Sequence, residues 1–458
     1  MKNLSLDTII KQIDGKISSG AANIIITDVM LGLKNVKPNS LVFDVYHQNY
    51  VKQMENIKDK PYAIVTDEPA NFLGKFENQT IIKVSNVKTA SLSFIKFYRN
   101  LFDIPLIGVT GTCGKTTTKE MIKHILSQKY KVNATYKSYN AQYRHMSYLM
   151  DFDDSTQAAV IEMGVAYKGD LKIACRYFKP QTGVITNIGV DHLNAFGTLD
   201  AYIKGKAEFL EGLDNKGRLI LNADDENIKK INLSGYKGKI IYFGESKQAD
   251  YKISYIKQTQ DGITFLIQNN NEVRRVHLPI NGEFNAYNAT AAIAAVGNMG
   301  FSLKGAIDAL ATFNNVERHF EVKQGLRGST LIDDTWSINP TSTESALKHL
   351  KALSNGRITI AVLGKMSLLG RQSEYYHNKI GEKIAELGIN KLVAIGAGTD
   401  GFCTGAMKKG MDKNNINLCK NSEEAYNVLS KLLDANTVAL VKTSMLASFA
   451  DLVVKLEK

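Results

Sequence analysis

The residues best suited to chemistry occupy positions 108–118, GVTGTCGKTTT, directly after a short apolar segment. Glycines in such a loop let backbone N–H groups approach phosphate oxygens, because no Cβ atom stands in the way. A following lysine neutralises the charge of the β- and γ-phosphates, and the next hydroxyl ligates Mg²⁺. The stretch lacks one glycine of the strict GxxxxGK[ST] pattern and matches the variant GTxGKT[ST]. It predicts a phosphate-binding loop made of Gly111, Thr112, Gly114, Lys115, Thr116 and Thr117.

Two elements must hold this loop, a strand before it and a helix after it. Residues 105–109 are apolar, and residues 116–128 carry apolar side chains at helical spacing. Three more buried strands are predicted, at 159–163, 183–187 and 219–222, with helical segments between them. Strands that alternate with helices indicate a parallel sheet with helices on both faces. Between residues 249 and 279 the alternating pattern instead predicts antiparallel strands joined by turns.

The whole chain is predicted to be α/β and to fold as three domains. A length of 458 residues exceeds what one hydrophobic core supports. We expect a small N-terminal substrate-binding α/β domain at 1–103 and a central mononucleotide-binding domain at 104–314. The remaining residues, 315–458, predict a Rossmann-like α/β domain with strands near 331–332, 358–363, 392–395 and 438–441.

Composition restricts the classes of function. Charged residues make up 22% and hydrophobic residues 44%, with no apolar run long enough for a bilayer and no secretory signal pattern. The four cysteines have no CxxC spacing, which favours a reducing cytoplasm. The formal net charge is +12, but the lysines are spread along the chain without a dense basic block. We therefore expect a cytoplasmic monomer that binds small anionic molecules, without a nucleic-acid partner or a membrane span.

A second set of residues could hold metal ions. Glu162 stands at the end of a predicted strand, where ligands collect in open α/β sheets, and its carboxylate suits Mg²⁺. His192 lies in TNIGVDHL at 186–193, and Lys206 follows it by fourteen residues. A lone histidine is more often structural, so the prediction depends on this combination.

Together these segments resemble the Mur ligase family from about residue 20 onwards. The family's motifs occur in its order: VIEMG at 160–164, TNIGVDHL at 186–193, GKAEF at 205–209, LNADD at 221–225, GEFNAYN at 282–288, RHFE at 318–321 and KTS at 442–444. The resemblance implies ATP and two Mg²⁺ ions, with an N6-carboxylated lysine at position 206. It implies metal ligands at Thr116, Glu162, His192 and Lys206, and catalytic roles for Lys115, His192 and Lys206. Further nucleotide-binding residues implied by it are Asn187, Asn285, Asn288, Arg318, Asp333 and Asp334.

The resemblance also implies the reaction. A substrate carboxylate is activated by ATP as an acyl phosphate, and an amine attacks it to form an amide. The segments IDDTWSINP at 332–340 and AVLGKMSLLG at 361–370 resemble the branch that adds D-alanyl-D-alanine. We therefore expect an amino acid or a dipeptide such as D-Ala-D-Ala to be added to a UDP-MurNAc-peptide, in the synthesis of cell-wall precursors.

Two segments depart from that branch and leave alternatives open. Residues 26–30 (ITDVM) replace an STDSR-like segment that helps to hold the UDP end, and valine cannot make the hydrogen bonds of serine. In 135–144, only Thr135 and Asn140 of the TxxNxNNxxG pattern remain. One alternative is an amide ligase for a carboxylate without UDP, in a specialised peptide or secondary-metabolite pathway. Another is a catalytically silent ATP-binding regulatory module. An unrelated P-loop kinase or ATPase is disfavoured by the spacing of His192 and Lys206.

Overall fold

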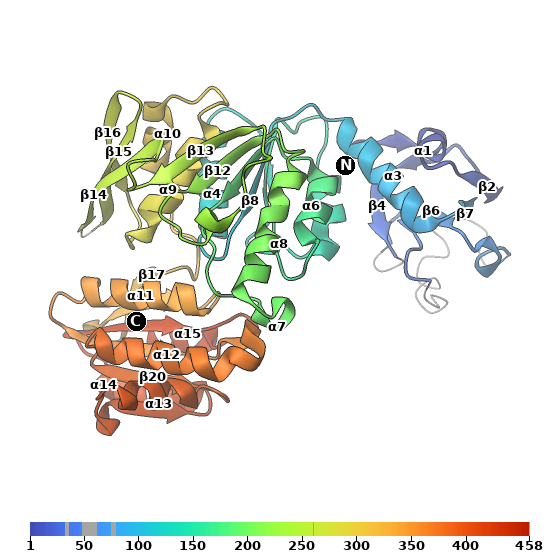
Figure 1. Cartoon of the computed structure of the whole chain (residues 1–458). Coiled ribbons are helices and arrows are strands. Elements are labelled where there is room, and N and C mark those ends of the chain that lie inside the picture. Colours follow the sequence, from blue (N-terminus) through green and yellow to red (C-terminus); the bar gives the residue numbers. More distant parts are fainter. Residues whose placement is uncertain (33–35, 48–61, 75–78, 260, 458) are drawn as a thin grey trace.

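The structure, a computed structural model, describes residues 1–32, 36–47, 62–74, 79–259 and 261–457. Its three large sheets follow one another along the chain, and Figure 1 shows them as three bodies. The N-terminal body, coloured blue, contacts only the central one in this view, and the orange and red C-terminal body lies below the central one. Each sheet lies within one of the predicted domains, so we keep the boundaries at 103/104 and 314/315 as our proposal.

The N-terminal sheet has the strand order β2-β7-β6-β5-β4, parallel except for β2. The elements are β1 (Leu4–Ser5), α1 (Leu6–Ile13), β2 (Lys16–Ser19), β3 (Ile25–Ile26), β4 (Asp28–Leu31), β5 (Ser40–Phe43), β6 (Tyr62–Thr66), η2 (Pro69–Asn71), β7 (Gln79–Lys83) and α3 (Val87–Asn100). Helix α3 connects this body to the central one, because the buried Tyr98 hydroxyl donates a 2.7 Å hydrogen bond to the Phe152 carbonyl.

The central domain is built on one nine-stranded sheet, in the order β16-β15-β14-β13-β12-β11-β8-β10-β9. Its elements are β8 (Leu106–Thr110), α4 (Lys115–Leu126), β9 (Val132–Ala134), η3 (Gln142–Arg144), α5 (His145–Met150), β10 (Ala158–Glu162), α6 (Asp170–Phe178), β11 (Thr182–Ile185), α7 (Leu193–Phe196), α8 (Leu199–Gly212), β12 (Arg218–Asn222), η4 (Ile228–Lys230), β13 (Lys239–Gly244), β14 (Tyr251–Thr259), β15 (Gly262–Asn269), β16 (Glu272–Leu278), α9 (Phe284–Val296) and α10 (Leu303–Leu310). Strands β8 to β14 are parallel, and β14, β15 and β16 are antiparallel. The predicted parallel sheet and antiparallel segment are therefore parts of a single sheet.

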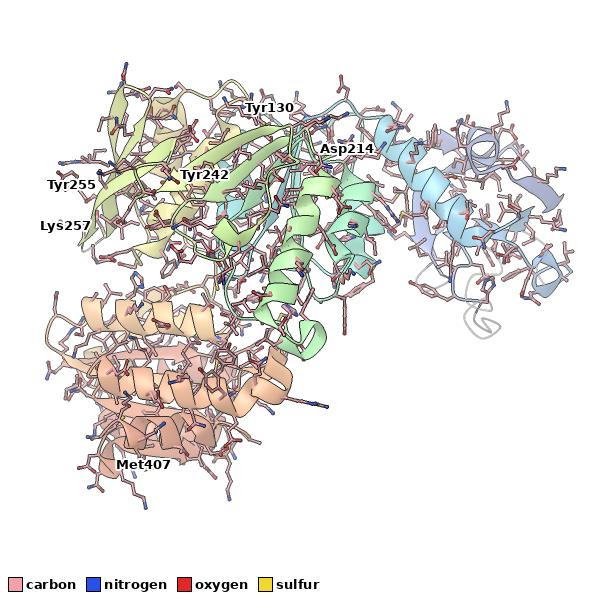
Figure 2. All side chains as sticks on the ribbon, in the orientation of Figure 1. Tyr130, Asp214, Tyr242, Tyr255, Lys257 and Met407 are labelled. Carbon is pink, nitrogen blue, oxygen red and sulfur yellow. The ribbon has the colours of Figure 1, made fainter. Side chains whose placement is uncertain are left out.

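A bulge interrupts the pairing of β14 with β15 between Ser254 and Lys257. Tyr255 lies there with φ 52° and 82% of its surface exposed, and its side chain points away from the domain (Figure 2). Strands β13, β12 and β11 separate this bulge on β14 from β8, the strand that leads into the phosphate loop.

The C-terminal sheet has the order β17-β18-β22-β19-β20-β21, parallel except for β17. Its elements are β17 (Glu321–Gln324), η5 (Leu326–Gly328), β18 (Thr330–Asp334), α11 (Pro340–Leu353), β19 (Ile358–Leu363), η6 (Ser367–Gln372), α12 (Ser373–Glu386), β20 (Lys391–Ile395), α13 (Asp400–Lys408), η7 (Lys413–Asn415), β21 (Ile416–Cys419), α14 (Ser422–Leu432), β22 (Thr437–Lys442) and α15 (Ala450–Leu456). Helices α11, α12 and α13 share one hydrophobic core with the sheet, and α14 and α15 share another. The predicted Rossmann-like arrangement is confirmed.

The strand order of the central sheet determines where a ligand-binding site is expected. β8 lies between β11 and β10, so the chain leaves it toward one side of the sheet and later returns on the other. Crevices at such a switch point bind ligands at the carboxyl ends of the strands. The loop after β8 and Glu162, the last residue of β10, lie at that edge. Within the described ranges, no helix has the length and apolarity needed to cross a membrane.

Candidate active site

The loop between β8 and α4 has the conformation that its glycines allow. Gly114 has φ 76°, and a Cβ on it would lie 2.3 Å from Oδ1 of Asn288. Gly111 has φ 149°, and its Cβ would lie 2.0 Å from the Thr186 hydroxyl. Only glycine avoids both the strain and the clash. The loop is followed by Lys115, the first residue of α4, whose Nζ donates a 2.9 Å hydrogen bond to the Thr112 carbonyl.

Asn187 fixes the loop from the neighbouring strand end. Its Oδ1 accepts a hydrogen bond of 2.9 Å from the Cys113 N–H, and its Nδ2 donates one of 3.0 Å to the Cys113 carbonyl. Burial raises the pKa of the Cys113 thiol to about 11, which keeps it protonated and uncharged at neutral pH. The loop therefore places no added negative charge beside a bound phosphate.

Thr116 and Glu162 have the chemistry that Mg²⁺ requires. The Thr116 hydroxyl shares a 2.6 Å hydrogen bond with the Ser138 hydroxyl, and Oε1 of Glu162 accepts one of 2.7 Å from the Asn140 amide. Oε2 of Glu162 is buried and has no hydrogen-bond partner among the described residues. An orphaned buried carboxylate oxygen is costly unless a cation takes it, so this pair fits an oxygen-ligated magnesium ion.

His192 and Lys206 meet around Tyr202. The His192 ring stacks on the Tyr202 ring at 6.1 Å, and Nζ of Lys206 lies 5.0 Å from the centre of the same ring. Lys206 is buried, and Nζ donates hydrogen bonds to the Gly111 carbonyl (2.9 Å) and the Thr110 hydroxyl (3.3 Å). Burial, with Lys115 nearby, lowers the pKa of Lys206 well below its ordinary value, and burial also lowers the pKa of His192. Both shifts are toward the neutral form.

Helix α9 contributes two asparagines, but only one faces the open site. Asn288 lines the cavity described below. Asn285 is buried, donates a 2.7 Å hydrogen bond to the Asn281 carbonyl, and accepts one of 2.9 Å from the Asn288 amide. Asn285 therefore orients Asn288 from behind.

The third domain presents an ion pair to the site. Nζ of Lys442 lies 2.5 Å from Oδ2 of Asp334 and donates a 3.0 Å hydrogen bond to the Ser337 carbonyl. Arg318 donates hydrogen bonds to the Thr335 hydroxyl (2.8 Å) and carbonyl (2.7 Å), with its guanidinium 5.6 Å from the Trp336 ring. The buried Asp333 accepts hydrogen bonds from Thr335 and lies 3.5 Å from Lys323.

A cavity of about 990 Å³ brings most of these groups together between the central and third domains. Ten of the predicted residues line it: Thr112, Gly114, Lys115, Thr116, Thr117, Glu162, Asn187, His192, Asn288 and Asp334. Five other predicted residues do not line it: Gly111, Lys206, Asn285, Arg318 and Asp333. Ser138 also lines it, and sequence reasoning did not identify it, because it lies in an irregular loop where no periodicity marks an inward-facing side chain.

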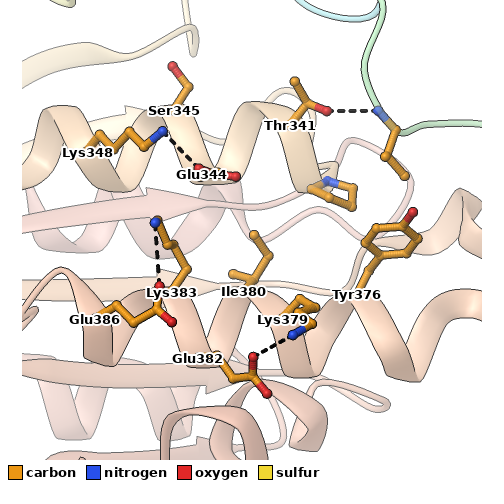
Figure 3. Close-up of a pocket in the computed structure, with 12 residues that line it drawn as sticks. Thr341, Glu344, Ser345, Lys348, Tyr376, Lys379, Ile380, Glu382, Lys383 and Glu386 are labelled. Atoms are coloured by element: carbon orange, nitrogen blue, oxygen red, sulfur yellow. Dashed lines mark hydrogen bonds and ion pairs between the residues drawn. The ribbon is translucent and has the colours of Figure 1, made fainter. Parts of the chain in front are cut away.

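The two domains contact each other directly beside this cavity. The Val190 N–H donates a 2.8 Å hydrogen bond to the Thr341 hydroxyl, at the start of α11. Figure 3 shows this contact at one end of a smaller cavity, of about 580 Å³, between α11 and α12. There Lys348, Lys379 and Lys383 each pair with a glutamate of their own helix. These lysines are paired with carboxylates, whereas Lys115 forms no ion pair within the described part of the chain.

Comparison with known proteins gives two matching family models. The Mur ligase middle domain matches residues 109–296, and the "Mur ligase, glutamate ligase domain" matches residues 318–445. The UDP-N-acetylmuramoyl-tripeptide–D-alanyl-D-alanine ligase of Bacillus subtilis is 30% identical over 332 residues, which cover 72% of this chain and 71% of that protein. The Escherichia coli enzyme of the same name is 27% identical over 319 residues, 69% of this chain and 70% of its own.

Solved structures agree on the fold. A crystal structure of MurF from Acinetobacter baumannii has a TM-score of 0.88 at 22% identity, covering 100% of this chain and 99% of that one. MurF from Thermotoga maritima, in complex with ADP, has a TM-score of 0.79 at 21% identity, covering 93% and 96%. With the phosphate loop, the strand-end glutamate and the three sheets in the same chain, the protein belongs to the Mur ligase family.

Proposed function

We propose that this member of the Mur ligase family is an ATP-dependent carbon–nitrogen ligase that adds D-alanyl-D-alanine to a UDP-N-acetylmuramoyl-tripeptide. The relatives named for that reaction support the substrates, since one is 30% identical over 72% of the chain. The observation that carries the chemistry is the cavity in which Lys115, Glu162 and His192 face Asp334 of the third domain. An acyl-phosphate ligase needs such an arrangement, because ATP must meet a carboxylate out of contact with water.

ATP is proposed to lie with its phosphates on the loop at residues 111–114. Backbone N–H groups and the N-terminal end of α4 favour negative charge there. Lys115 is free to move its ammonium group from the Thr112 carbonyl to the β- and γ-phosphates. Asn288 and Asp334 line the same cavity and would hold the rest of the nucleotide, with Asn285 and Arg318 orienting their neighbours.

Magnesium is proposed at the Thr116 hydroxyl and the Glu162 carboxylate, with a second ion near His192. When bound, it would offset charge on the transferring phosphoryl group. Histidine, cysteine, aspartate and glutamate side chains of the described ranges form no group of three suited to a metal. The ligand set therefore needs the Thr116 hydroxyl and, for the second ion, an oxygen from elsewhere. N6-carboxylation of Lys206 would supply one and convert a buried cation into an anion.

The proposed reaction has two steps. The substrate carboxylate attacks the γ-phosphorus of ATP, with Lys115 stabilising the added charge, and ADP leaves. The amine of the dipeptide then attacks the acyl carbon, and phosphate departs as the amide forms. The third domain helps to keep water out, because the Val190–Thr341 hydrogen bond holds it against the central domain.

Of the two segments that depart from the D-alanyl-D-alanine-adding branch, residues 26–30 pack against the central domain. Val29 is buried in a hydrophobic cluster with Met146 and Leu149, where β4 packs against α5. Where the branch has a serine hydroxyl, Val29 thus contributes packing between the first and central domains. A carboxylate substrate without UDP is therefore the alternative to UDP-MurNAc-tripeptide, and the assay distinguishes the two.

The test is phosphate release by the purified chain with ATP, Mg²⁺, UDP-MurNAc-tripeptide and D-Ala-D-Ala. We expect one phosphate per peptide product, and no product when either substrate is left out. Turnover with other carboxylates alone would replace the proposed substrate. ATP binding without turnover on any carboxylate offered would indicate the silent module.

We also propose the cytoplasm as the site of action and a monomer as the working form. All four cysteines are unpaired, as expected in a reducing compartment that holds ATP. Sedimentation of the purified chain with and without ATP measures the state of association.

A further inference from the structure

We propose that Lys119 is a positioning residue for the magnesium site, acting through the loop at residues 135–140, which we call the ligand loop. The inference rests on the proposed function only in taking Thr116 and Glu162 as magnesium ligands. Lys119 stands one turn beyond Lys115 on α4, but it contacts no residue of the phosphate loop in the hydrogen bonds of the described chain.

Lys119 is completely buried, and its ammonium group uses all three of its N–H donors. One bonds the Glu120 carboxylate, one the Thr135 carbonyl at 2.7 Å, and one the Lys137 carbonyl at 2.8 Å. A buried ammonium is tolerated only when it is paired and fully hydrogen-bonded. Two of its three partners are backbone carbonyls of one irregular loop, so the charge holds the shape of that loop.

The ligand loop lies outside the helices and strands, and its first residue, Thr135, donates a 3.4 Å backbone hydrogen bond to the Val160 carbonyl of β10. Its residue Lys137 has φ 47°, a left-handed conformation that side chains other than glycine rarely adopt. The carbonyl of this same residue accepts a hydrogen bond from Lys119. Removing the ammonium group would therefore release the loop at its most strained point.

The side chains of the ligand loop touch both proposed magnesium ligands. Ser138 bonds the Thr116 hydroxyl at 2.6 Å, and the Asn140 amide donates to Oε1 of Glu162 at 2.7 Å. The Thr135 hydroxyl accepts a 2.9 Å hydrogen bond from the Glu162 N–H. The loop thus fixes the directions of two groups on different elements, helix α4 and strand β10, and Lys119 fixes the loop.

The same loop reaches the third domain. Nζ of Lys137 lies 2.9 Å from a Glu317 carboxylate oxygen, and the Tyr139 and Trp336 rings are 6.2 Å apart. The ligand loop therefore contacts both the third domain, which would close over the site, and the side chains proposed to bind magnesium. Since outer partners that orient metal ligands typically alter affinity by about 10- to 100-fold, loss of Lys119 should weaken metal binding rather than nucleotide binding.

The experiment measures Mn²⁺ binding to the chain saturated with ADP, by calorimetry, in Lys119→Met. Methionine retains the length and burial and removes the three donors. We expect Mn²⁺ affinity to fall about tenfold, while ADP affinity in EDTA stays within about twofold. Lys123→Met is the matched control, an exposed lysine one turn further along the same helix, and should change neither value.

Ser138→Ala provides a second arm that leaves Lys119 in place. It should weaken Mn²⁺ binding by itself, and adding it to Lys119→Met should cause less further loss than it causes alone, because both changes act through one loop. If Lys119→Met does not fold, Ser138→Ala alone decides. Wild-type Mn²⁺ affinity in a folded variant overturns the inference. A wild-type chain that binds no Mn²⁺ beside ADP overturns the proposed magnesium site and this inference together.

Discussion

Asp334 and Lys442 lie opposite each other on the neighbouring parallel strands β18 and β22 and form an ion pair of 2.5 Å. The lysine side chain is 2% exposed and the aspartate side chain 14% exposed. The pair stands at the carboxyl ends of both strands, on the wall of the cavity. The ion pair therefore contributes both to the stability of the third domain and to the cavity wall that is proposed to face ATP.

Lys442→Met should destabilise the third domain by about 3 kcal/mol, because it leaves a mostly buried carboxylate without its partner. Urea unfolding followed by circular dichroism measures this. The double variant with Asp334→Asn should recover most of the loss, since no uncompensated charge then remains. Equal unfolding midpoints for the single and double variants would contradict the account.

Lys115→Ala should reduce ATP turnover at least about 1,000-fold, because the transferring phosphoryl group loses its nearest cation. Phosphate release under saturating substrates measures the effect. The thermal unfolding midpoint should hardly move, since the Lys115 side chain makes a single hydrogen bond in the described structure, to the Thr112 carbonyl. Retained turnover would remove Lys115 from the proposed mechanism.

Lys206 should bind carbon dioxide as a carbamate. Carbamate formation requires the neutral amine, and burial lowers the pKa of Lys206, which shifts this lysine toward that form. Chain equilibrated with ¹³C-bicarbonate should show a carbamate carbon resonance that is absent in Lys206→Ala. The variant should lose most activity and regain part of it with added formate or acetate. A missing resonance in the wild-type chain would leave an unmodified lysine in this place.

Gly189→Ala should force the central and third domains apart. An added Cβ would lie 2.1 Å from the Thr341 hydroxyl, beside the Val190–Thr341 hydrogen bond. We expect a larger radius of gyration by X-ray scattering and a KM for ATP raised about tenfold, as a lost contact of about 1.4 kcal/mol implies. Gly235→Ala is the control, because a Cβ there meets no atom within 4 Å.

Local sequence patterns predicted the elements that carry the chemistry. The apolar segment 105–109 forms β8, the helical spacing after it forms α4, and the predicted strand at 159–163 is β10, ending at Glu162. These succeed because a buried strand and an amphipathic helix each show their periodicity within one short window. The antiparallel segment was also predicted. Its pairing with the parallel sheet was not predicted, because strand order depends on contacts between residues far apart in the sequence.

Contacts between irregular segments could not be predicted. Nothing in the sequence around Ser138 indicates that its hydroxyl reaches Thr116, because the loop follows neither a two-residue nor a 3.6-residue period. A lysine in a helix is normally expected at an exposed position. The tertiary structure instead buries Lys119, where it donates hydrogen bonds to two backbone carbonyls. Arg318 and Asn285 are predicted to bind the nucleotide, and in the structure their side chains bond Thr335, Asn281 and Asn288. A single sequence does not distinguish a residue that binds from one that orients its neighbour.

The chain contains a single tryptophan, Trp336, and its position gives the protein a built-in optical signal. The indole lines the cavity between the His319 ring, stacked at 5.8 Å, and the Tyr139 ring of the central domain. The tryptophan emission therefore reports on a single environment, the contact between the third domain and the ligand loop. Fluorescence recorded during a single turnover would follow opening and closing of the enzyme without any attached dye.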